Sequence, residues 1–529
     1  MTPPAFTTVD RSTSPPRIHV PRDYNAAVDF VDRHLAEGRG AKVAFVDDTT
    51  SLTYAGLAEQ VSRAGNALLA LGVRREQRVM LVLQDTVSFP ALFFGAIKIG
   101  AVPVPVNTLL TAEDYDGLLR DSRAVALVIS AALFPKVAPV LGGQPFLEHV
   151  VVDGAAAEPG PSLALAPLLD RAAATLAAAP TTADDVAFWL YTSGSTGKFK
   201  GAVHLQSDLV HTAELYAVPV LGLREDDVVF SAAKLFFAYG LGNSLAFPLR
   251  VGATAVLMAE RPTVAAVRRR LVEKEPTVFC GVPTLFASLL ADADLAPTSK
   301  LRVSTSAGEA LPRDLGERWR ERMGTDILDG IGSTEMLHIF LSNRPGDVRY
   351  GTTGKVVPGY ELKIVDEQGA LVPAGGVGDL WVCGPTSATA YWNKRDLSRA
   401  TFHGAWTRTG DHYLCDEDGY YVYQGRSDDM LKVGGIYVSP FEVEAALVSH
   451  HKVLEAAVVA HRDEHDLVKP KALVVLKDLE HASEALADEL RAHVKAALAP
   501  YKYPRWVEFV RELPKTATGK IQRFKLRQS

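Results

Sequence analysis

Hydrophobic and polar positions along this chain follow two different periods, and these periods divide it into regions. From Tyr24 onward, stretches with the apolar spacing of helices alternate with short apolar runs such as Arg78–Leu83, Ala126–Ser130 and His149–Val152. A continuous apolar run between two helices is typical of a strand that is buried on both faces of a parallel sheet. The pattern therefore predicts an α/β fold whose large N-terminal part holds two sheet layers.

The stretch from Ala155 to Pro180 interrupts this alternation because it is rich in alanine and proline. It contains the runs Leu163–Leu169 and Ala172–Ala178, which are rich in leucine and alanine. Both residues favour helices, so the sequence predicts loop plus helix in this stretch. A disordered low-complexity linker is the alternative.

The pattern changes again after Thr353, where short strand-like runs are separated by Gly, Pro and Asp turns. These runs predict a small, compact β subdomain. From Asp428 to the end, mixed helices and strands followed by a basic tail predict a small, separate α+β lid. We therefore expect two domains, residues 1–427 and 428–529. The predicted elements are strands at Glu361–Val365, Asp379–Val382, Tyr420–Tyr423, Ala456–Ala460 and Ala472–Leu476, and helices at Pro440–Ser449 and Ser483–Leu498.

The composition is that of a soluble globular protein, because 47% of the 529 residues are hydrophobic and 22% are charged. The net charge of −6 argues against nucleic acid or an anionic membrane as main partner, since both bind basic surfaces. The N-terminal sequence lacks a secretion signal, and no apolar run is long enough to span a membrane. The cysteines lack zinc-site spacing and predict no disulfide framework. We expect a cytoplasmic protein.

The run from Tyr191 to Gly201 concentrates hydroxyls, glycines and two lysines. Glycines let several backbone N–H groups face one anion, hydroxyls add donors, and Lys198 adds positive charge, so the run is suited to hold phosphate. It is not a Walker loop, because Thr192 and Phe199 stand where that motif requires Gly and Ser or Thr. A flexible linker is the alternative, but the apolar flanks favour a loop between buried strands.

Further motifs follow this loop along the chain. Together with it they resemble the acyl-adenylate-forming superfamily of acyl-CoA synthetases, firefly-type luciferases and peptide-synthetase adenylation domains. The resemblance covers nearly the whole chain, and several motifs in one order are far more specific than any single motif. It implies ATP and Mg²⁺ as cofactors. The motifs are Ser306–Pro312, Asp329–Glu335, Thr407–Asp411, Gly425–Asp429 and Pro514–Lys520.

Lys520 matches the adenylation lysine of this superfamily. An acyl adenylate forms when a carboxylate attacks the α-phosphorus of ATP, and an ammonium that reaches both anions reduces their repulsion. A solvated lysine in the basic tail is the alternative. Glu335 matches the magnesium ligand, since carboxylate oxygen suits Mg²⁺ beside phosphates, and Thr334 is expected to hydrogen-bond phosphate. Glu335 could otherwise balance the dipole of a helix N-terminus.

Asp411 matches the residue that accepts both ribose hydroxyls, with a turn-forming aspartate as the alternative, and Arg426 is expected to add a donor. The superfamily usually has an aromatic residue where this chain has Ile331, so adenine is expected to rest on an aliphatic face. The ATP- and AMP-binding residues that the resemblance implies are Thr192, Ser193, Gly194, Ser195, Thr196, Gly197, Lys198, Ala307, Gly308, Glu309, Asp329, Gly330, Ile331, Gly332, Ser333, Asp411 and Arg426.

In the relatives, a C-terminal lid rotates after adenylation, and Asp428 matches its hinge residue. The loop that contains Lys432, Gly434 and Gly435 would then face the acyl group, where glycines let a pantetheine arm pass close to the backbone. A tight turn and an exposed lysine are the alternatives for these residues. CoA is favoured as acyl acceptor over a separate carrier protein, because no carrier segment follows Lys520 in this chain.

The acid is expected to bind between the segments Lys234–Gly242 and Met336–Phe340. With the run Gly-Ile-Gly-Ser-Thr-Glu-Met-Leu-His, these segments resemble the benzoate–CoA ligase branch. A flat apolar slot would bury roughly 100–150 Å² of a phenyl ring, which contributes about 2.5–4 kcal/mol. The apolar members could instead be core residues, and His338 a packing histidine. The implied acid-binding residues are Phe236, Ala238, Tyr239, Gly240, Leu337, His338 and Ile339.

The sequence thus predicts an AMP-forming ligase that converts benzoate to benzoyl-AMP and then to benzoyl-CoA. Substituted benzoates are not excluded, because one methyl-sized group changes binding by only about 1–3 kcal/mol. The alternatives are a stand-alone enzyme that loads a carrier protein and a nucleotide-binding regulator without turnover. A homodimer is compatible with the sequence, although no heptad pattern predicts one.

Overall fold

The computed structural model describes residues 6–154, 162–193, 199–426, 429–433, 436–464, 467–498, 502–515 and 521–526. Its contacts group the chain into two compact units. The predicted domain boundary between residues 427 and 428 lies inside the second unit and stays a prediction. Unit 1 comprises Met1–Tyr350, Val356–Glu361 and Cys383–Thr407, and unit 2 comprises Gly351–Lys355, Leu362–Val382 and Arg408–Ser529.

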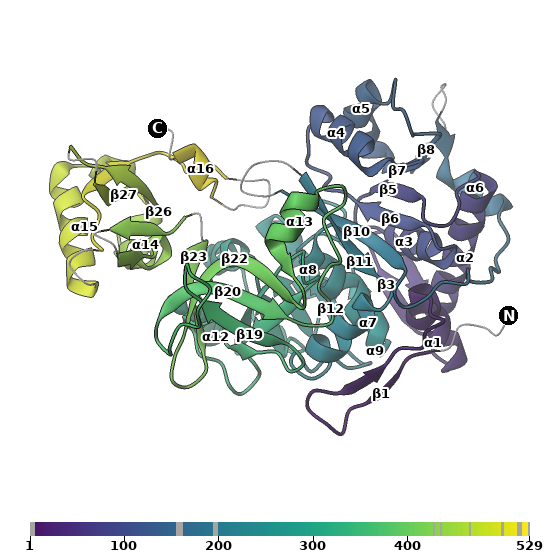
Figure 1. Cartoon of the computed structure of the whole chain (residues 1–529), viewed down its shortest axis with the longest axis horizontal. Helices are drawn as coiled ribbons and strands as arrows, with labels where there is room; N and C mark the ends of the chain where they lie inside the picture. The colour runs from purple at the N-terminus through teal and green to yellow at the C-terminus, as the bar shows by residue number, and fades with distance from the viewer. Residues whose placement is uncertain are drawn as a thin grey trace. The chain divides into compact units, whose positions relative to one another are not determined.

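The first sheet of unit 1 has parallel strands in the order β6-β5-β7-β8-β9. Figure 1 shows α2 and α3 on one side of this sheet and α4 and α5 on the other. Leu118 of α4 shares a buried cluster with Met80 and Leu127 of the sheet. The elements are β5 (Arg78–Val82), β6 (Val102–Pro105), β7 (Ala126–Ser130), β8 (His149–Asp153), β9 (Leu163–Ala164), α2 (Tyr54–Ala70), α3 (Ser88–Lys98), α4 (Ala112–Ser122), α5 (Phe134–Val137) and α6 (Leu165–Arg171).

The prediction of loop plus helix for the Ala- and Pro-rich stretch is confirmed over its described residues, 162–180. Helix α6 forms within the expected region, whereas Ala172–Ala178 is not helical. The Asn66 side chain donates to Ala173 O at 2.8 Å and to Thr175 O at 3.0 Å. These carbonyls therefore find their partners on α2 rather than within a helix.

The second sheet of unit 1 runs in the order β18-β17-β16-β15-β14-β12-β13-β3-β4. Its strands from β3 to β16 are parallel, while β4 and β17 pair antiparallel with their neighbours. Both sheets confirm the predicted parallel α/β fold. The strands are β3 (Val43–Val46), β4 (Ser51–Thr53), β12 (Val228–Ser231), β13 (Thr254–Val256), β14 (Val278–Gly281), β15 (Val303–Ser306), β16 (Ile327–Gly332), β17 (Ile339–Ser342) and β18 (Lys355–Val356).

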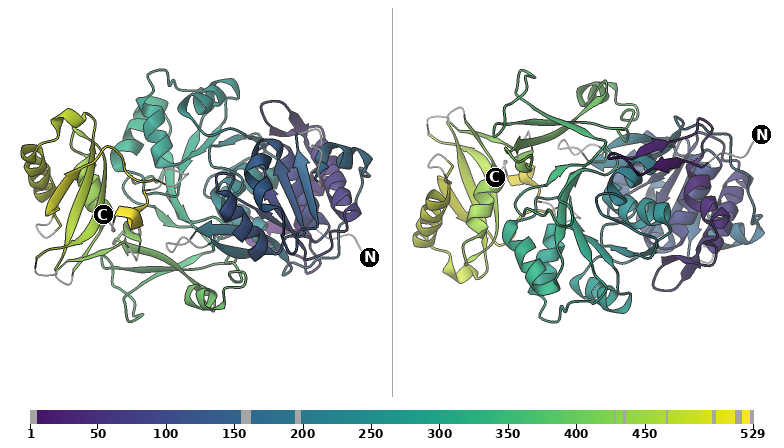
Figure 2. Two further views of the ribbon diagram at one scale, coloured as in Figure 1. Left: turned by 90° about the horizontal axis from the view of Figure 1, so that it is seen from above. Right: turned by 90° about the horizontal axis from the view of Figure 1, so that it is seen from below.

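Helices α11 and α12 of this part of unit 1 pack apolar side chains against β14 of the second sheet. Trp319 of α12 lies edge-on to Phe286 of α11, with ring centroids 4.7 Å apart, and both belong to one buried cluster with Phe279 of β14. Figure 2 shows these blue-green helices from two further sides. The helices are α1 (Arg33–Ala36), α7 (Asp208–Thr212), α8 (Ala238–Leu241), α9 (Phe247–Val251), α10 (Val264–Glu273), α11 (Pro283–Ala291), α12 (Arg313–Met323) and α13 (Arg395–Thr401).

Several short elements complete unit 1. The strands β10 and β11 form an antiparallel hairpin, and β1 pairs antiparallel with β2. Three helical turns are π-helical, a form that often occurs near functional sites. These elements are β1 (Thr8–Asp10), β2 (Arg17–His19), β10 (Val186–Ser193), β11 (Phe199–Leu205), the 3₁₀ turns η2 (Ala131–Leu133) and η3 (Ala138–Val140), and the π-helical turns η1 (Val28–Asp32), η4 (Ala213–Ala217) and η5 (Gly242–Ala246).

Unit 2 contains the β subdomain and the C-terminal α+β part, and its elements match the predicted ones closely. In the C-terminal part, Val443 of α14 and Leu490 of α15 cover the same face of a sheet that orders β26-β27-β28. Within the described residues, no helix is both long and apolar enough to cross a membrane. The elements, with β21 from unit 1, are β19 (Glu361–Val365), β20 (Val377–Cys383), β21 (Phe402–His403), β22 (Trp406–Cys415), β23 (Tyr421–Arg426), β24 (Leu431–Val433), β25 (Ile436–Val438), β26 (Val453–Arg462), β27 (Val468–Leu476), β28 (Trp506–Phe509), α14 (Pro440–Val448), η6 (Leu479–His481), α15 (Glu484–Ala497) and α16 (Arg523–Leu526).

Candidate active site

The predicted phosphate loop lies at the turn of the β10–β11 hairpin. Gly194, Ser195, Thr196, Gly197 and Lys198 lie outside the described residues. The strands on both sides are paired up to the loop, because Thr192 faces Lys200 and Ser193 faces Phe199. Both strands contain buried residues, among them Leu190 and Ala202. The expected buried strands on both sides of the run are therefore present, and the phosphate-binding role of the run stays a prediction.

Glu335 lies in the turn after β16 and is half-buried. The Tyr391 hydroxyl donates to Glu335 Oε1 at 2.5 Å. Lys200 Nζ donates to the same hydroxyl at 3.3 Å and lies 4.6 Å from the centroid of the Tyr391 ring. Glu335 is not in a helix, so the alternative of a carboxylate that balances a helix dipole is wrong. The Tyr391 phenol therefore orients this carboxylate, and Lys200 contacts the phenol in turn.

The backbone of the same turn is held by several distant segments. His204 Nε2 lies 2.8 Å from Thr334 O, and Ala388 N donates to Glu335 O at 2.7 Å. Thr386 Oγ1 donates to Met336 O at 2.8 Å. A Cβ on Gly332 would lie 2.4 Å from a backbone oxygen, so only glycine fits there. The turn that carries Ser333, Thr334 and Glu335 is thus closely held by its surroundings.

The predicted adenine wall follows β15, next to the carboxyl end of β16. Ser306 of β15 pairs with Asp329 of β16. Gly308 has a φ of +93°, a left-handed conformation that favours glycine, and it is exposed, whereas Ala307 is buried. Burial raises the pKa of Asp329 well above its usual range. The expected members Glu309, Gly330, Ile331 and Gly332 continue these two segments.

The two predicted acid-binding segments meet at His338. His338 Nε2 lies 3.2 Å from Tyr239 O, and because a carbonyl only accepts hydrogen bonds, Nε2 carries the proton. The His338 ring stacks on Tyr239 at 5.5 Å and meets Phe247 edge-on at 4.5 Å. Burial lowers the pKa of His338 to about 3, so the imidazole is neutral at physiological pH.

The remaining acid-binding candidates differ in burial. Tyr239 OH lies 2.6 Å from Thr305 Oγ1, and Ala238 is half-buried. A Cβ on Gly240 would lie 2.0 Å from Lys234 O, which excludes any side chain there without movement. Phe236, Leu337 and Ile339 are all buried, so they pack as core residues in this structure, and their contact with an acid stays a prediction.

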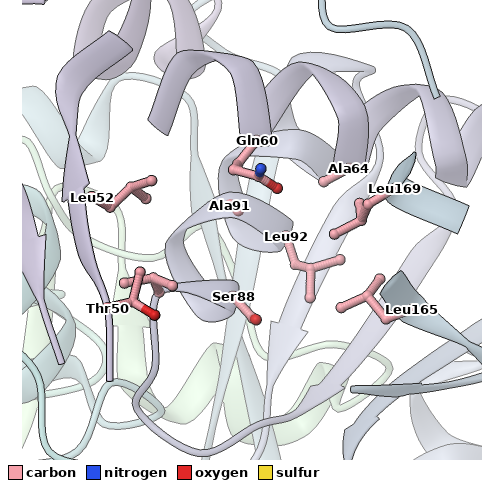
Figure 3. A pocket seen from close by; sticks show the side chains of 10 residues that line it. Thr50, Leu52, Gln60, Ala64, Ser88, Ala91, Leu92, Leu165 and Leu169 are labelled. Carbon is pink, nitrogen blue, oxygen red and sulfur yellow. The ribbon is translucent and has the colours of Figure 1, made fainter. Parts of the chain in front are cut away.

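A separate cleft of about 240 Å³ lies between β4, α2, α3 and α6 of unit 1. Figure 3 shows apolar side chains around it, with Thr50, Gln60 and Ser88 as polar members. The predicted acid-binding residues do not line this cleft. Its lining is Thr50, Leu52, Gln60, Ala64, Val87, Ser88, Ala91, Leu92, Leu165 and Leu169.

In unit 2, Asp411 and Arg426 face each other across neighbouring strands. Asp411 of β22 pairs with Arg426 of β23, and Arg426 Nη1 lies 3.1 Å from Asp411 Oδ1. Asp411 lies within a strand, so the alternative of a turn-forming aspartate is wrong. Gly410 has a φ of +76°, and a Cβ there would lie 3.0 Å from the Arg426 guanidinium. The carboxylate and the guanidinium are thus fixed side by side.

The predicted lid residues are only partly described. Lys520, Asp428, Gly434 and Gly435 lie outside the described residues. The backbone of Lys432 in β24 pairs with that of Tyr437 in β25. Before the final motif, Lys515 forms an isolated bridge with Ile521, and its ammonium pairs with Glu455 at 2.6 Å. Lys515 and Ile521, the described residues on either side of 516–520, are therefore paired with each other.

The described residues contain no cluster of three or more His, Cys, Asp or Glu side chains that could hold a metal on its own. A magnesium ion that shares its coordination with phosphates needs only one or two protein carboxylates. Glu335, half-buried and oriented by Tyr391, fits that requirement.

Sequence reasoning missed several residues that hold the site. Lys200 lies within the predicted phosphate-binding run Tyr191–Gly201, so its position in the sequence could have identified it as a site residue. Tyr391, Thr386 and His204 had no such signal, because each reaches the Thr334–Met336 turn from a segment at least 50 residues away. A motif search cannot predict a contact of that kind.

Family models and curated proteins match this chain over most of its length. The AMP-binding enzyme family matches residues 32–392, and the AMP-binding enzyme C-terminal domain matches residues 442–520. The chain is 60% identical to a benzoate–CoA ligase of Thauera aromatica, over 98% of this chain and 99% of that protein. It is 51% identical to a 4-hydroxybenzoate–CoA/benzoate–CoA ligase of Rhodopseudomonas palustris, over 96% and 94% of the two chains.

Solved structures agree with these sequence matches. The crystal structure of a benzoate CoA ligase from Burkholderia xenovorans superposes with a TM-score of 0.88 at 55% identity, covering 95% of this chain and 100% of that chain. The anthranilate CoA ligase AuaEII, solved with anthranoyl-AMP, superposes with a TM-score of 0.92 at 45% identity, covering 96% and 98%.

Proposed function

Because the chain belongs to the AMP-binding enzyme family, in its benzoate–CoA ligase branch, we propose that it is a benzoate–CoA ligase. The observation that carries this proposal is the 60% identity to a benzoate–CoA ligase over 98% of the chain. The reaction converts benzoate, ATP and CoA to benzoyl-CoA, AMP and pyrophosphate. Substituted benzoates are proposed as further substrates, since one relative is named for 4-hydroxybenzoate as well as benzoate.

In the first half-reaction, a benzoate oxygen attacks the α-phosphorus of ATP, the bond to pyrophosphate breaks, and benzoyl-AMP forms. Both reactants are anions, so the enzyme must surround them with positive charge and donors. We assign Lys520 to the contact with both anions and residues 192–198 with Thr334 to the phosphates. Bound Mg²⁺ would neutralise phosphate charge, and Glu335 is the ligand that we propose for it.

The other roles follow from the chemistry of each group. Asp411 is proposed to accept the ribose hydroxyls, with Arg426 as a second contact, because a carboxylate offers acceptors only. The benzoate ring is proposed to lie beside Ala238, Tyr239 and His338. Burial holds the pKa of His338 at about 3, and a neutral imidazole is compatible with an apolar ring as neighbour.

In the second half-reaction, the CoA thiol attacks the carbonyl carbon of benzoyl-AMP and AMP leaves. We propose that residues 428–529 form a lid that rotates about the hinge residue Asp428 between the two half-reactions. The backbone around Lys432, Gly434 and Gly435 would then border the pantetheine arm.

The test uses purified full-length protein with MgATP, benzoate and either CoA or a phosphopantetheinylated carrier protein. We expect benzoate-dependent exchange of labelled pyrophosphate into ATP, and benzoyl-CoA with AMP once CoA is added. Exchange without benzoyl-CoA, but with acylated carrier, would instead establish the carrier-loading alternative. An absence of exchange with benzoate and a panel of other carboxylic acids would refute the proposed function.

A further inference from the structure

The segment Lys234–Gly240 contains four of the seven predicted acid-binding residues and closes on itself. Phe237 N donates to Lys234 O at 3.0 Å, and Gly240 packs against the same oxygen so closely that a Cβ would lie 2.0 Å from it. Because both ends of this loop touch, fixing Lys234 and Leu235 also fixes Ala238 and Tyr239 between them.

A carboxylate from the other sheet fixes the first end of the loop. Asp85 follows β5 of the first sheet, and Leu235 N lies 3.3 Å from its Oδ1 and 3.2 Å from its Oδ2. Lys234 Nζ lies 4.0 Å from Asp85 Oδ2 and donates to Met258 O and Glu260 O. One side chain thus holds two successive loop residues, through a backbone N–H and through an ammonium.

Asp85 is itself held in place by its neighbours. Gln84 N donates to Ser130 Oγ at 3.0 Å, and Val87 N donates to Asp47 Oδ2 at 3.1 Å. Asp85 is buried, which raises its pKa to about 6, even though Lys234 and Leu235 N–H favour its charged form. Burial thus opposes the ionised form of this carboxylate, and its contacts with Lys234 and Leu235 N–H favour that form.

We propose that Asp85 is a positioning residue for the aromatic acid, because it holds the loop Lys234–Gly240 in the shape that presents Ala238 and Tyr239 to the ring. This inference rests on the proposed benzoate activity. Asp85 is not expected to touch the acid, and it acts through Leu235 and Lys234.

The test compares Asp85→Ala and Asp85→Asn with the wild type. Asp227→Asn is the control, because Asp227 is also buried and pairs with Arg302 at 2.6 Å. Asp227 precedes β12, whereas the acid loop follows this strand, so the two lie at opposite ends of it. For Asp85→Ala we expect the KM for benzoate to rise about tenfold, as for one lost charged hydrogen bond, with the KM for ATP unchanged. The order of the fluorobenzoate isomers by kcat/KM should also change.

Asp85→Asn should raise the KM for benzoate less than Asp85→Ala does, because the amide oxygen still accepts from Leu235 N–H. Amide hydrogen exchange across residues 235–240 should be faster in Asp85→Ala than in wild type, and unchanged in Asp227→Asn. If Asp85→Ala does not fold, Asp85→Asn is compared with the wild type on the same measurements, and an increase in benzoate KM of at least twofold with unchanged ATP KM is expected.

A wild-type benzoate KM and isomer ranking in a folded Asp85 variant would overturn the inference. Equal increases in the KM for benzoate and for ATP would also overturn it, because they would indicate a general structural role. Failure of the proposed function has a different signature, since the wild type itself would then show no benzoate-dependent pyrophosphate exchange.

Discussion

His34 and His338 are both buried, and burial lowers the pKa of the first to about 4 and of the second to about 3. His34 has a partner on each ring nitrogen: Nε2 donates to Leu249 O at 2.6 Å, and Nδ1 accepts from Arg39 Nε at 2.8 Å. Among the described residues, Nδ1 of His338 has no such partner. An unpaired buried nitrogen costs free energy that a ligand or water can recover, which fits a pocket wall.

We predict that His34 makes the protein less stable as the pH falls from about 6.5 to 4. In this range the unfolded chain binds a proton at His34 that the folded state excludes, so the unfolded state is favoured by up to about 3 kcal/mol. Urea midpoints measured by tryptophan fluorescence between pH 7 and 4 should decline less steeply for His34→Gln than for wild type. His403→Gln, at an exposed position, serves as control, and identical slopes for all three proteins would contradict the prediction.

Tyr391 provides a second test at the scale of single residues. Tyr391→Phe removes the hydroxyl that donates to Glu335, so we expect the rate of benzoyl-AMP formation to fall about tenfold while the KM for benzoate is unchanged. The apparent Mg²⁺ requirement should rise, because Glu335 is no longer oriented. Tyr115→Phe removes a hydroxyl that donates to Asn107 O in another part of unit 1 and should leave both quantities unchanged. Loss of activity without a change in the Mg²⁺ requirement would count against the orienting role.

At the scale of elements, α2 and α3 cross where glycine faces glycine. A Cβ on Gly95 of α3 would lie 2.8 Å from Ala64 Cβ and 2.9 Å from Gly65 N, so these helices pack more closely than larger residues would allow. Gly117 of α4 has open space around the position of a Cβ. Close helix packing therefore requires glycine at position 95, whereas no contact among the described residues requires it at position 117.

We predict opposite effects of alanine at these two glycines. Gly95→Ala should lower the stability of the protein by about 1–3 kcal/mol, because the helices must separate. Gly117→Ala should raise it by about 0.5–1 kcal/mol, because alanine restricts the unfolded chain and favours helix. Thermal unfolding followed by circular dichroism measures both changes, and a destabilised Gly117→Ala variant would show that the space beside this helix is not open.

The elements that sequence predicted well are those with a local signal. The strand Glu361–Val365 and the helix that begins at Pro440 were predicted at their observed bounds or within one residue, because apolar period and start signals are local. The sequence predicted loop plus helix for the Ala- and Pro-rich stretch but could not say which run is the loop, since that depends on the bonds from Asn66 to Ala173 O and Thr175 O. Asp85 and Tyr391 were not predicted as site residues, because they reach their partners across 150 and 56 positions of the chain.

At the scale of the whole molecule, the motifs identified the family because each one is a short run whose chemistry can be recognised by itself. The division into units was not predictable in the same way, since it depends on which segments pack together. Residues Gly351–Lys355 and Leu362–Val382 group with Arg408–Ser529, although Cys383–Thr407 returns to unit 1. Chain order alone therefore does not determine the boundary of a compact unit.

The two half-reactions give the last prediction, because they require different residues of one chain. Lys520→Ala should reduce the rate of benzoyl-AMP formation by about 100-fold or more, because it removes a cation that bridges two anions. It should still convert supplied benzoyl-AMP and CoA to benzoyl-CoA. Lys515→Ala is the matched control, because this lysine belongs to the same motif but pairs with Glu455 at 2.6 Å, and it should retain both half-reactions. Single-turnover assays of each half-reaction measure the difference, and an equal loss of both in Lys520→Ala would contradict a role confined to adenylation.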